Sequence, residues 1–335
     1  MKRGATSLAV LVLVLVAPVA WASPDEARDW LQRMSDALAG RNYDGLFTHS
    51  SGNKTETMRI VHRSENGQSE ERLVSLDGMG REIVRTSQEV HAYMPDRRVV
   101  LVEPRTDDSS LLQTLPTPTP KLDSLYELSL QAGTRLLGRE TQVIDIRPRD
   151  AYRYGYRLWL DAETAMPLRS TVSDTAGRPI EQIQFTRLEM KDRIPDKDIE
   201  PAVDATGFQW VRTARHLASA QWPAIVWRPL RMPPGFHLQT TRIQVLPGSP
   251  MPAQHLIFSD GIAAVSVFIE PSGTTGPRPP ETSSMGSANA YSTSVQGHVI
   301  TAVGEVPLET VRYFADSVAP VHDQPAPPKA ALVNP

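Results

Sequence analysis

Apolar and polar residues alternate with a period of two through much of the first half of this chain. Successive side chains of a β-strand point to opposite faces, so this alternation predicts strands with one buried face. Turn sequences such as Glu65-Asn66-Gly67 and Thr175-Ala176-Gly177 separate the segments. The sequence therefore predicts antiparallel hairpins, with one strand face carrying Met58 and Ile60; Val90, Ala92 and Met94; Tyr156, Leu158 and Leu160; and Leu168, Ser170 and Val172.

Helical spacing is confined to three places. Ser23-Pro24-Asp25-Glu26 combines an N-cap, an N1 proline and a capping-box Glu, and an amphipathic pattern follows as far as Gly40. A short helix is predicted over 122–128, inside a long loop between Val102 and Gln142 that is either a lid or a plain surface connection. A last helix is predicted from Leu308 to Val318.

The second half repeats the strand pattern. Leu256 and Phe258, then Val265, Val267 and Ile269, predict a hairpin around Ser259-Asp260-Gly261. The stretch 271–287 is rich in Gly, Pro and Ser and is expected to be a flexible loop.

The first 22 residues have the features of a secretory leader. Lys2 and Arg3 precede an apolar run from Leu8 to Val19, and Ala20-Trp21-Ala22 supplies small residues before a cleavage site. The run is shorter than the roughly 20 residues that cross a bilayer. The chain has no Cys, so an exported product has no disulfide and no cysteine to lipidate.

The predicted domain division follows from length and composition. We expect a signal peptide (1–22), a large domain (23–196), a linker (197–222), a small α+β domain (223–319) and a disordered tail (320–335). The formal net charge is −3, and this slightly acidic balance argues against a nucleic-acid partner.

No catalytic or metal-binding motif stands out. No two of the eight histidines lie within five residues of each other, so we expect no metal and no cofactor. Ser51-Gly52-Asn53-Lys54 matches the Ser-x-x-Lys of penicillin-recognising enzymes, but Lys54-Thr55 is followed by Glu56 where their Lys-Thr-Gly motif has Gly, and the sequence has no Ser-Asp-Asn. The sequence favours a protein that is not an enzyme, with a hydrolase using Ser51 and Lys54 as a remote alternative.

A curved sheet with one apolar face can pack a core or hold an acyl chain. The predicted lipid-binding positions are Ile83, Val90, Ala92, Val100, Ile144, Leu158 and Val172, and ordinary core is the alternative for each of them. Phe236 follows two prolines and a glycine and is predicted to be either an interface anchor or a core residue. Arg153 and Arg157 belong to a group of arginines suited to phosphate or carboxylate.

The first half contains Leu76-Asp77-Gly78, Arg81-Glu82-Ile83-Val84, Tyr154-Gly155-Tyr156-Arg157-Leu158-Trp159-Leu160-Asp161 and Met166-Pro167-Leu168. The second half contains Trp227, Pro233-Pro234-Gly235-Phe236, Phe258-Ser259-Asp260-Gly261, Ser292-Thr293-Ser294-Val295 and Val303-Gly304-Glu305-Val306-Pro307. In this order they resemble the MucB/RseB family, periplasmic regulators of the sigma-E (AlgU) envelope-stress response. The resemblance covers essentially all of residues 25 to 318.

The resemblance implies a mainly β (α+β) fold. The large domain would be a LolA/LolB-like unclosed antiparallel β-barrel with helices, and the second a smaller antiparallel sheet with a C-terminal helix. It implies a periplasmic protein that binds a MucA/RseA-type anti-sigma factor and shields it from regulated proteolysis, and that lipopolysaccharide or an acyl lipid releases. Phe236, Phe258, Arg153 and Arg157 are the predicted partner-binding residues. A periplasmic lipid or lipoprotein carrier of the LolA type is the alternative, and a homodimer is left open.

Overall fold

The computed structural model describes residues 24–78, 80–105, 112, 115–117, 119, 121–212, 226–245, 252–272 and 279–321 of the 335-residue chain. The predicted signal peptide, and residues 322–335 of the predicted tail, lie outside these ranges.

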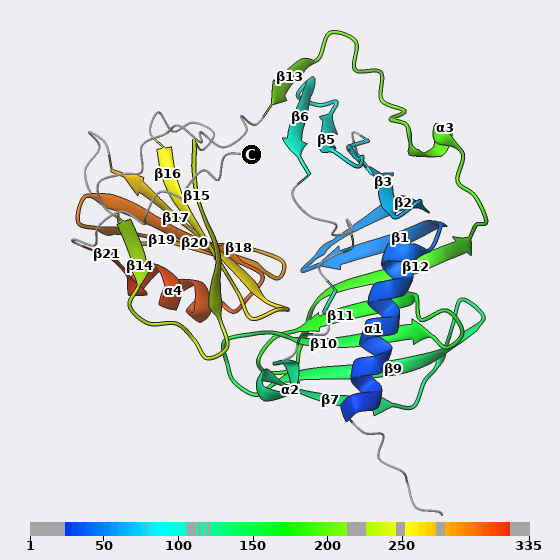
Figure 1. Ribbon diagram of the computed structural model, residues 1–335, viewed down its shortest axis with the longest axis horizontal. Coiled ribbons are helices and arrows are strands. Elements are labelled where there is room, and N and C mark those ends of the chain that lie inside the picture. Colours follow the sequence, from blue (N-terminus) through cyan, green and yellow to red (C-terminus); the bar gives the residue numbers. More distant parts are fainter. Residues whose placement is uncertain are drawn as a thin grey trace, which may run out of the picture.

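A large sheet dominates the first half (Figure 1). Its strands are β1 (Tyr43–Ser51), β2 (Lys54–Glu65), β3 (Gln68–Ser75), β4 (Glu82–Arg85), β5 (Glu89–Met94), β6 (Val99–Pro104), β7 (Tyr126–Gln131), β8 (Arg135–Leu136), β9 (Arg139–Pro148), β10 (Gly155–Asp161), β11 (Pro167–Ser173), β12 (Pro179–Met190) and β13 (Gln209–Arg212). Their order is β13-β6-β5-β4-β3-β2-β1-β12-β11-β10-β9-β7, with β8 beside β9. The end strands β13 and β7 do not pair with each other, so the barrel is unclosed.

Helix α1 (Pro24–Gly40) lies across the inner face of this sheet (Figure 1). Its apolar stripe, Ala27, Leu31 and Met34, is fully buried against strand residues such as Ile144 and Leu158. At Gly45 a Cβ atom would lie 2.4 Å from Phe185 Cε1, so the absence of a side chain on β1 leaves the space that the Phe185 ring of β12 fills. The predicted opening helix and the predicted hairpins are confirmed.

The segment before β7 differs from its prediction. Helix α2 (Leu122–Leu125) ends after four residues, and Tyr126 begins a strand that pairs with β9. Leu112 and Leu115, from the expected loop, are buried in the core of the large domain. This stretch of the loop therefore packs into the core of the large domain as well as connecting two strands.

Much of the expected linker packs on the large sheet. Helix α3 (Asp196–Ile199) lies against β2 and β3, and β13 pairs in parallel with β6. Between them, the backbone N–H groups of Ala202 and Val203 donate to the buried Glu82 carboxylate at 3.2 and 3.3 Å. Phe208 packs on Val84, Tyr93 and Val100 of the outer face. These contacts hold residues 196–212 to the first domain.

The second domain is a smaller antiparallel sheet with one helix packed on it. Strands β15 (His237–Val245), β16 (Pro252–Ser259), β17 (Ala264–Pro271), β18 (Glu281–Met285), β19 (Ala288–Val295) and β20 (His298–Gly304) form it in the order β15-β16-β17-β20-β19-β18. Helix α4 (Leu308–Ser317) covers one face, and β14 (Val226–Pro229) pairs with β21 (Val318–Val321).

Two expectations for this domain need correction. Part of the stretch expected to be a flexible loop is strand β18, because its backbone pairs with β19 despite a Ser- and Thr-rich sequence. Pro320 and Val321, assigned to the tail, belong to β21. The predicted fold class is confirmed: an unclosed, almost wholly antiparallel sheet with helices, joined to a smaller antiparallel sheet with a C-terminal helix.

Candidate functional site

A row of apolar side chains crosses the inner face of the large sheet beyond the area that α1 covers. Direct cross-strand neighbours run from Ile60 through Leu73, Ile83 and Ala92 to Leu101. Ile60 is fully buried in the main core, whereas the other four are half-buried. We call Leu73, Ile83, Ala92 and Leu101 the inner apolar row, since it extends the core surface into a partly open region.

The predicted lipid-binding residues divide between three environments. Ile83, Val90 and Ala92 are half-buried and lie on the inner face, in or beside the inner apolar row. Ile144 and Leu158 are 0% exposed in the core beneath α1, and Val172 packs against that core. Val100 lies on the outer face, in the cluster with Phe208. The structure thus brings together only three of the seven on the open part of the inner face.

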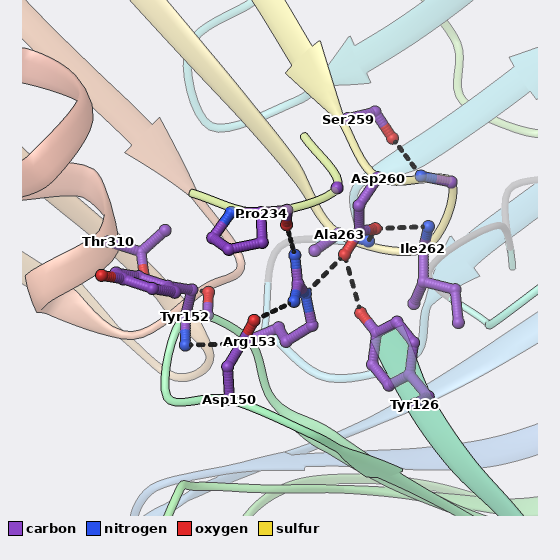
Figure 2. A network of polar contacts seen from close by, with 12 residues as sticks. Tyr126, Asp150, Tyr152, Arg153, Pro234, Ser259, Asp260, Ile262, Ala263 and Thr310 are labelled. Atoms are coloured by element: carbon purple, nitrogen blue, oxygen red, sulfur yellow. Dashed lines mark hydrogen bonds and ion pairs between the residues drawn. The ribbon is translucent and has the colours of Figure 1, made fainter. Parts of the chain in front are cut away.

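A buried ion pair joins the two domains. Arg153, which follows β9, donates through Nε to Asp260 Oδ2 at 2.7 Å, and neither side chain is exposed to solvent. Its Nη2 atom donates to the Pro234 carbonyl at 2.6 Å, and Nη1 donates to Asp150 (Figure 2). The guanidinium also lies over the Phe236 ring. One arginine of the large domain therefore holds two segments of the small one.

Asp260 accepts hydrogen bonds on both carboxylate oxygens. Tyr126 Oη donates to Oδ2 at 3.0 Å, and the backbone N–H groups of Ile262 and Ala263 donate to Oδ1 at 2.8 and 2.7 Å (Figure 2). Burial, followed by the Asp260 charge, raises the pKa of Tyr126, which keeps its hydroxyl a donor. The sequence assigned Asp260 to a hairpin turn, and no local pattern indicates its distant partners.

Two further contacts extend this junction along α4 and β19. Thr310 Oγ1 donates to the Tyr152 carbonyl at 2.9 Å, and the Tyr152 and Tyr313 rings meet edge to face. Asn289 Nδ2 donates to Tyr154 Oη at 2.9 Å. Consecutive residues 152 to 154 thus all contact the second domain.

The tip of the β18–β19 hairpin forms a separate part of the junction. The Ser287 N–H donates to Glu181 Oε2 at 3.3 Å, while His49 Nε2 lies 2.8 Å from Glu181 Oε1. The hydrogen bond that His49 donates to Glu181 raises the pKa of His49. Burial raises the pKa of Glu181, but hydrogen bonds from His49 and Ser287 outweigh it, and the net shift is downward.

The predicted partner-binding residues occupy different places. Phe236 and Phe258 are 5% and 0% exposed and pack on Phe314 of α4, so both contribute to the core of the second domain. Arg153 is fully buried between the two domains, where its guanidinium already binds Asp260, Asp150 and the Pro234 carbonyl. Arg157 alone lies on an open surface, in a groove of about 640 Å³ on the outer face that Trp159, Thr171 and Gln182 also line.

Arg157 is held in that groove by a buried carboxylate. Asp145 accepts from Arg157 Nη2 at 2.8 Å and from Arg147 Nη2 at 3.3 Å. The Asp145 carboxylate is almost fully buried, while the Arg147 and Arg157 side chains are 64% and 48% exposed. Two oriented cations therefore face the groove.

Within the described residues, no group of three or more His, Asp or Glu side chains is arranged to hold a metal ion. Among the helices described there, none combines the length and the apolar character needed to cross a membrane. Ser51 and Lys54 are direct partners that close a two-residue hairpin between β1 and β2.

Comparison with known proteins supports a family assignment for both domains. The MucB/RseB N-terminal domain model matches residues 26–203, and the MucB/RseB C-terminal domain model matches residues 221–319. The sigma factor AlgU regulatory protein MucB of Pseudomonas aeruginosa is 32% identical over 325 residues, covering 94% of this chain and 97% of MucB. The sigma-E factor regulatory protein RseB of Escherichia coli K12 is 26% identical, covering 86% of this chain and 89% of RseB.

Solved structures give the same result. A chain of the Pseudomonas aeruginosa MucA/MucB complex matches with a TM-score of 0.69 at 30% identity, covering 89% of this chain and 100% of that chain. A crystal structure of MucB matches with a TM-score of 0.61 at 29% identity. The predicted family is confirmed: this chain belongs to the MucB/RseB family.

Proposed function

We propose that this protein is a periplasmic negative regulator that binds the periplasmic segment of a MucA/RseA-type anti-sigma factor. In this proposal binding shields the anti-sigma factor from regulated proteolysis, and lipopolysaccharide or an acyl lipid releases it. The observation that carries the proposal is the match, across both domains, to a MucB solved in complex with MucA. The leader-like first 22 residues support a periplasmic location.

For the lipid we favour the inner apolar row. Half-buried apolar side chains next to a packed core leave room for an acyl chain at little structural cost, because the surrounding core is already formed. Ile83, Val90 and Ala92 supply such surface on β4 and β5.

For the anti-sigma factor we favour surfaces that involve both domains. Arg157 and Arg147 offer oriented donors for carboxylates of an extended segment. Phe236 and Phe258 would act indirectly, by fixing the second domain against Arg153. A ligand that favours one domain arrangement then shifts the population that binds the other ligand, and the effect is reciprocal.

The test is a titration of residues 23–335 against the periplasmic segment of a MucA/RseA-type protein, followed calorimetrically and repeated with a lipopolysaccharide competitor. We expect micromolar or tighter binding that the lipid weakens, and lipid binding that saturating partner weakens by the same factor. Light scattering of the same samples shows whether the binding species is a monomer or a homodimer.

A lipid carrier of the LolA type is the second candidate, because the inner apolar row could serve it equally well. Binding of lipid without any binding of the partner segment would favour the carrier. Failure to bind either ligand would overturn both. Labelling of Ser51 by acylating probes would instead support the hydrolase alternative and contradict a function without catalysis.

A further inference from the structure

Three titratable side chains from both domains meet where the β18–β19 tip docks on the rim of the large sheet. His49 on β1 and Glu181 on β12 come from the first domain, with His49 Nε2 2.8 Å from Glu181 Oε1. Glu305 comes from the second domain and directly follows Gly304, the cross-strand partner of Asn289 beside the hairpin tip. The contact is close: Ser287 is 2% exposed, and a Cβ atom on Gly286 would lie 1.9 Å from Ser51 Oγ. Docking therefore places a carboxylate of the second domain near the ion pair of the first.

Protonation of His49 supplies a positive charge that offsets one of the two facing carboxylates. Glu181 and Glu305 then face one imidazolium, with Glu56 as the cross-strand neighbour of His49. When His49 is neutral, two carboxylates on opposite domains repel each other with no cation between them. The Tyr156 hydroxyl also faces Glu181 and Glu305 but stays neutral, because burial raises its pKa.

We propose that His49, Glu181 and Glu305 form a proton-operated latch between the domains, which protonation tightens and deprotonation loosens. The latch involves neither the anti-sigma factor nor a lipid, so it can hold or fail independently of the proposed function. The buried Arg153–Asp260 pair would fix the position of the second domain, and the latch would set how firmly its hairpin tip is held.

The sign follows from proton linkage. Partial burial, followed by the Glu181 charge, raises the pKa of Glu305 even though part of its side chain stays in solvent. The hydrogen bond to Glu181 raises the pKa of His49 above its usual 6.5, and the Glu305 charge adds a smaller rise. Because His49 and Glu181 belong to the same domain, only the part of this rise that comes from Glu305 depends on docking. Groups whose pKa rises on docking favour the docked form at low pH and lose that effect as pH rises through the raised pKa. For His49 this window begins near pH 6.5.

Fluorescence energy transfer between the domains tests the latch. The chain has no Cys, so Arg97→Cys and Arg228→Cys, both exposed and on different domains, can carry the two dyes. The titration from pH 5 to 8.5 is run in the otherwise native chain and with Asp260→Asn, which weakens the other half of the junction. In the native chain, in the Asp260→Asn variant or in both, we expect the ratio of docked to undocked molecules to fall by up to about tenfold between pH 5.5 and 8.

Two variants and one control make the result specific. Glu305→Gln should keep the docked fraction high at pH 8, because the repulsion is gone. His49→Gln should lower the docked fraction at pH 5.5 to the native value at pH 8. His91→Gln, which alters a histidine on β5, should leave the pH response unchanged. A docked fraction that is independent of pH in both backgrounds, or an undiminished response in both variants, overturns the proposal.

Discussion

Arg153 and Asp260, 107 residues apart in the sequence, form an ion pair with both side chains withdrawn from solvent. Removing one partner of such a pair leaves the other charge buried without compensation. Among the residues that the structure describes, Asp260 has three other donors, whereas Arg153 has Asp150 alone as a second carboxylate.

We expect Arg153→Ala and Asp260→Asn each to lower the free energy of unfolding by about 3–5 kcal/mol. Urea unfolding of the mature chain measures this. Arg212→Gln, which removes an exposed ion pair with Glu89, is the matched control and should cost less than about 1 kcal/mol. Equal small losses in all three variants would mean that the junction contributes little to stability.

We expect Phe236→Ala to lower the stability of the protein rather than to weaken partner binding directly. The ring is 5% exposed and packs on Phe314 and under the Arg153 guanidinium, so its loss leaves a cavity beside that buried cation. We expect a loss of about 3–5 kcal/mol in urea unfolding. An unchanged melting temperature with weaker partner binding would instead support the interface-anchor prediction.

Stability of the second domain should fall in acid because of His255. This ring is 8% exposed, stacks on Phe268, and neither nitrogen has a hydrogen-bond partner. Burial, and then the Arg242 charge, lowers its pKa to about 4. The unfolded chain therefore binds the proton more readily, and stability that is complete above pH 6.5 is lost as pH falls toward 4.

The expected loss between pH 7 and 4 is about 2–3 kcal/mol. His62, whose pKa burial also lowers, adds a change of the same sign in the first domain. Comparison of the native chain with His255→Phe by urea unfolding at each pH isolates the contribution of His255. If both proteins lose the same free energy in acid, His255 is not the titrating group.

Filling the inner apolar row should block lipid without unfolding the protein. Ala92→Trp places a large ring between Ile83 and Leu101 on the half-buried surface. We expect at least about tenfold weaker binding of an acyl lipid in a fluorescence displacement assay, with a melting temperature within a few degrees of native. Ala176→Trp, in an exposed turn, is the control. Unchanged lipid affinity in Ala92→Trp would remove the row as the lipid site.

Local rules predicted the elements whose partners lie nearby in the sequence. The helix that ends at Gly40 and the Asn66-Gly67 hairpin follow from capping and from the left-handed backbone of both turn residues. Strand β7 was missed because Leu122–Leu128 fits a helix as well as a strand, and pairing with β9 decides between them. Strand β18 was missed because its composition is that of a loop.

Tertiary contacts decided the rest. Nothing within the sequence around Arg153 indicates Asp260 as its partner, and a strand pattern does not reveal which face a helix will cover. Val100 and Ala92 both alternate correctly, yet one packs under Phe208 and the other stays half-open. The sequence could predict which strand face each candidate lipid-binding residue lies on. It could not predict which of these residues lie on the part of that face that stays open.

The parallel strand β13 changes the reach of the chain between the domains. Because β13 holds the chain to β6 as far as Arg212, only residues 213–225 separate this anchor from β14. A connection of about a dozen residues keeps two attached bodies at an effective concentration on the order of millimolar. The second domain therefore always encounters its docking surface, and contacts worth a few kcal/mol decide between attachment and release.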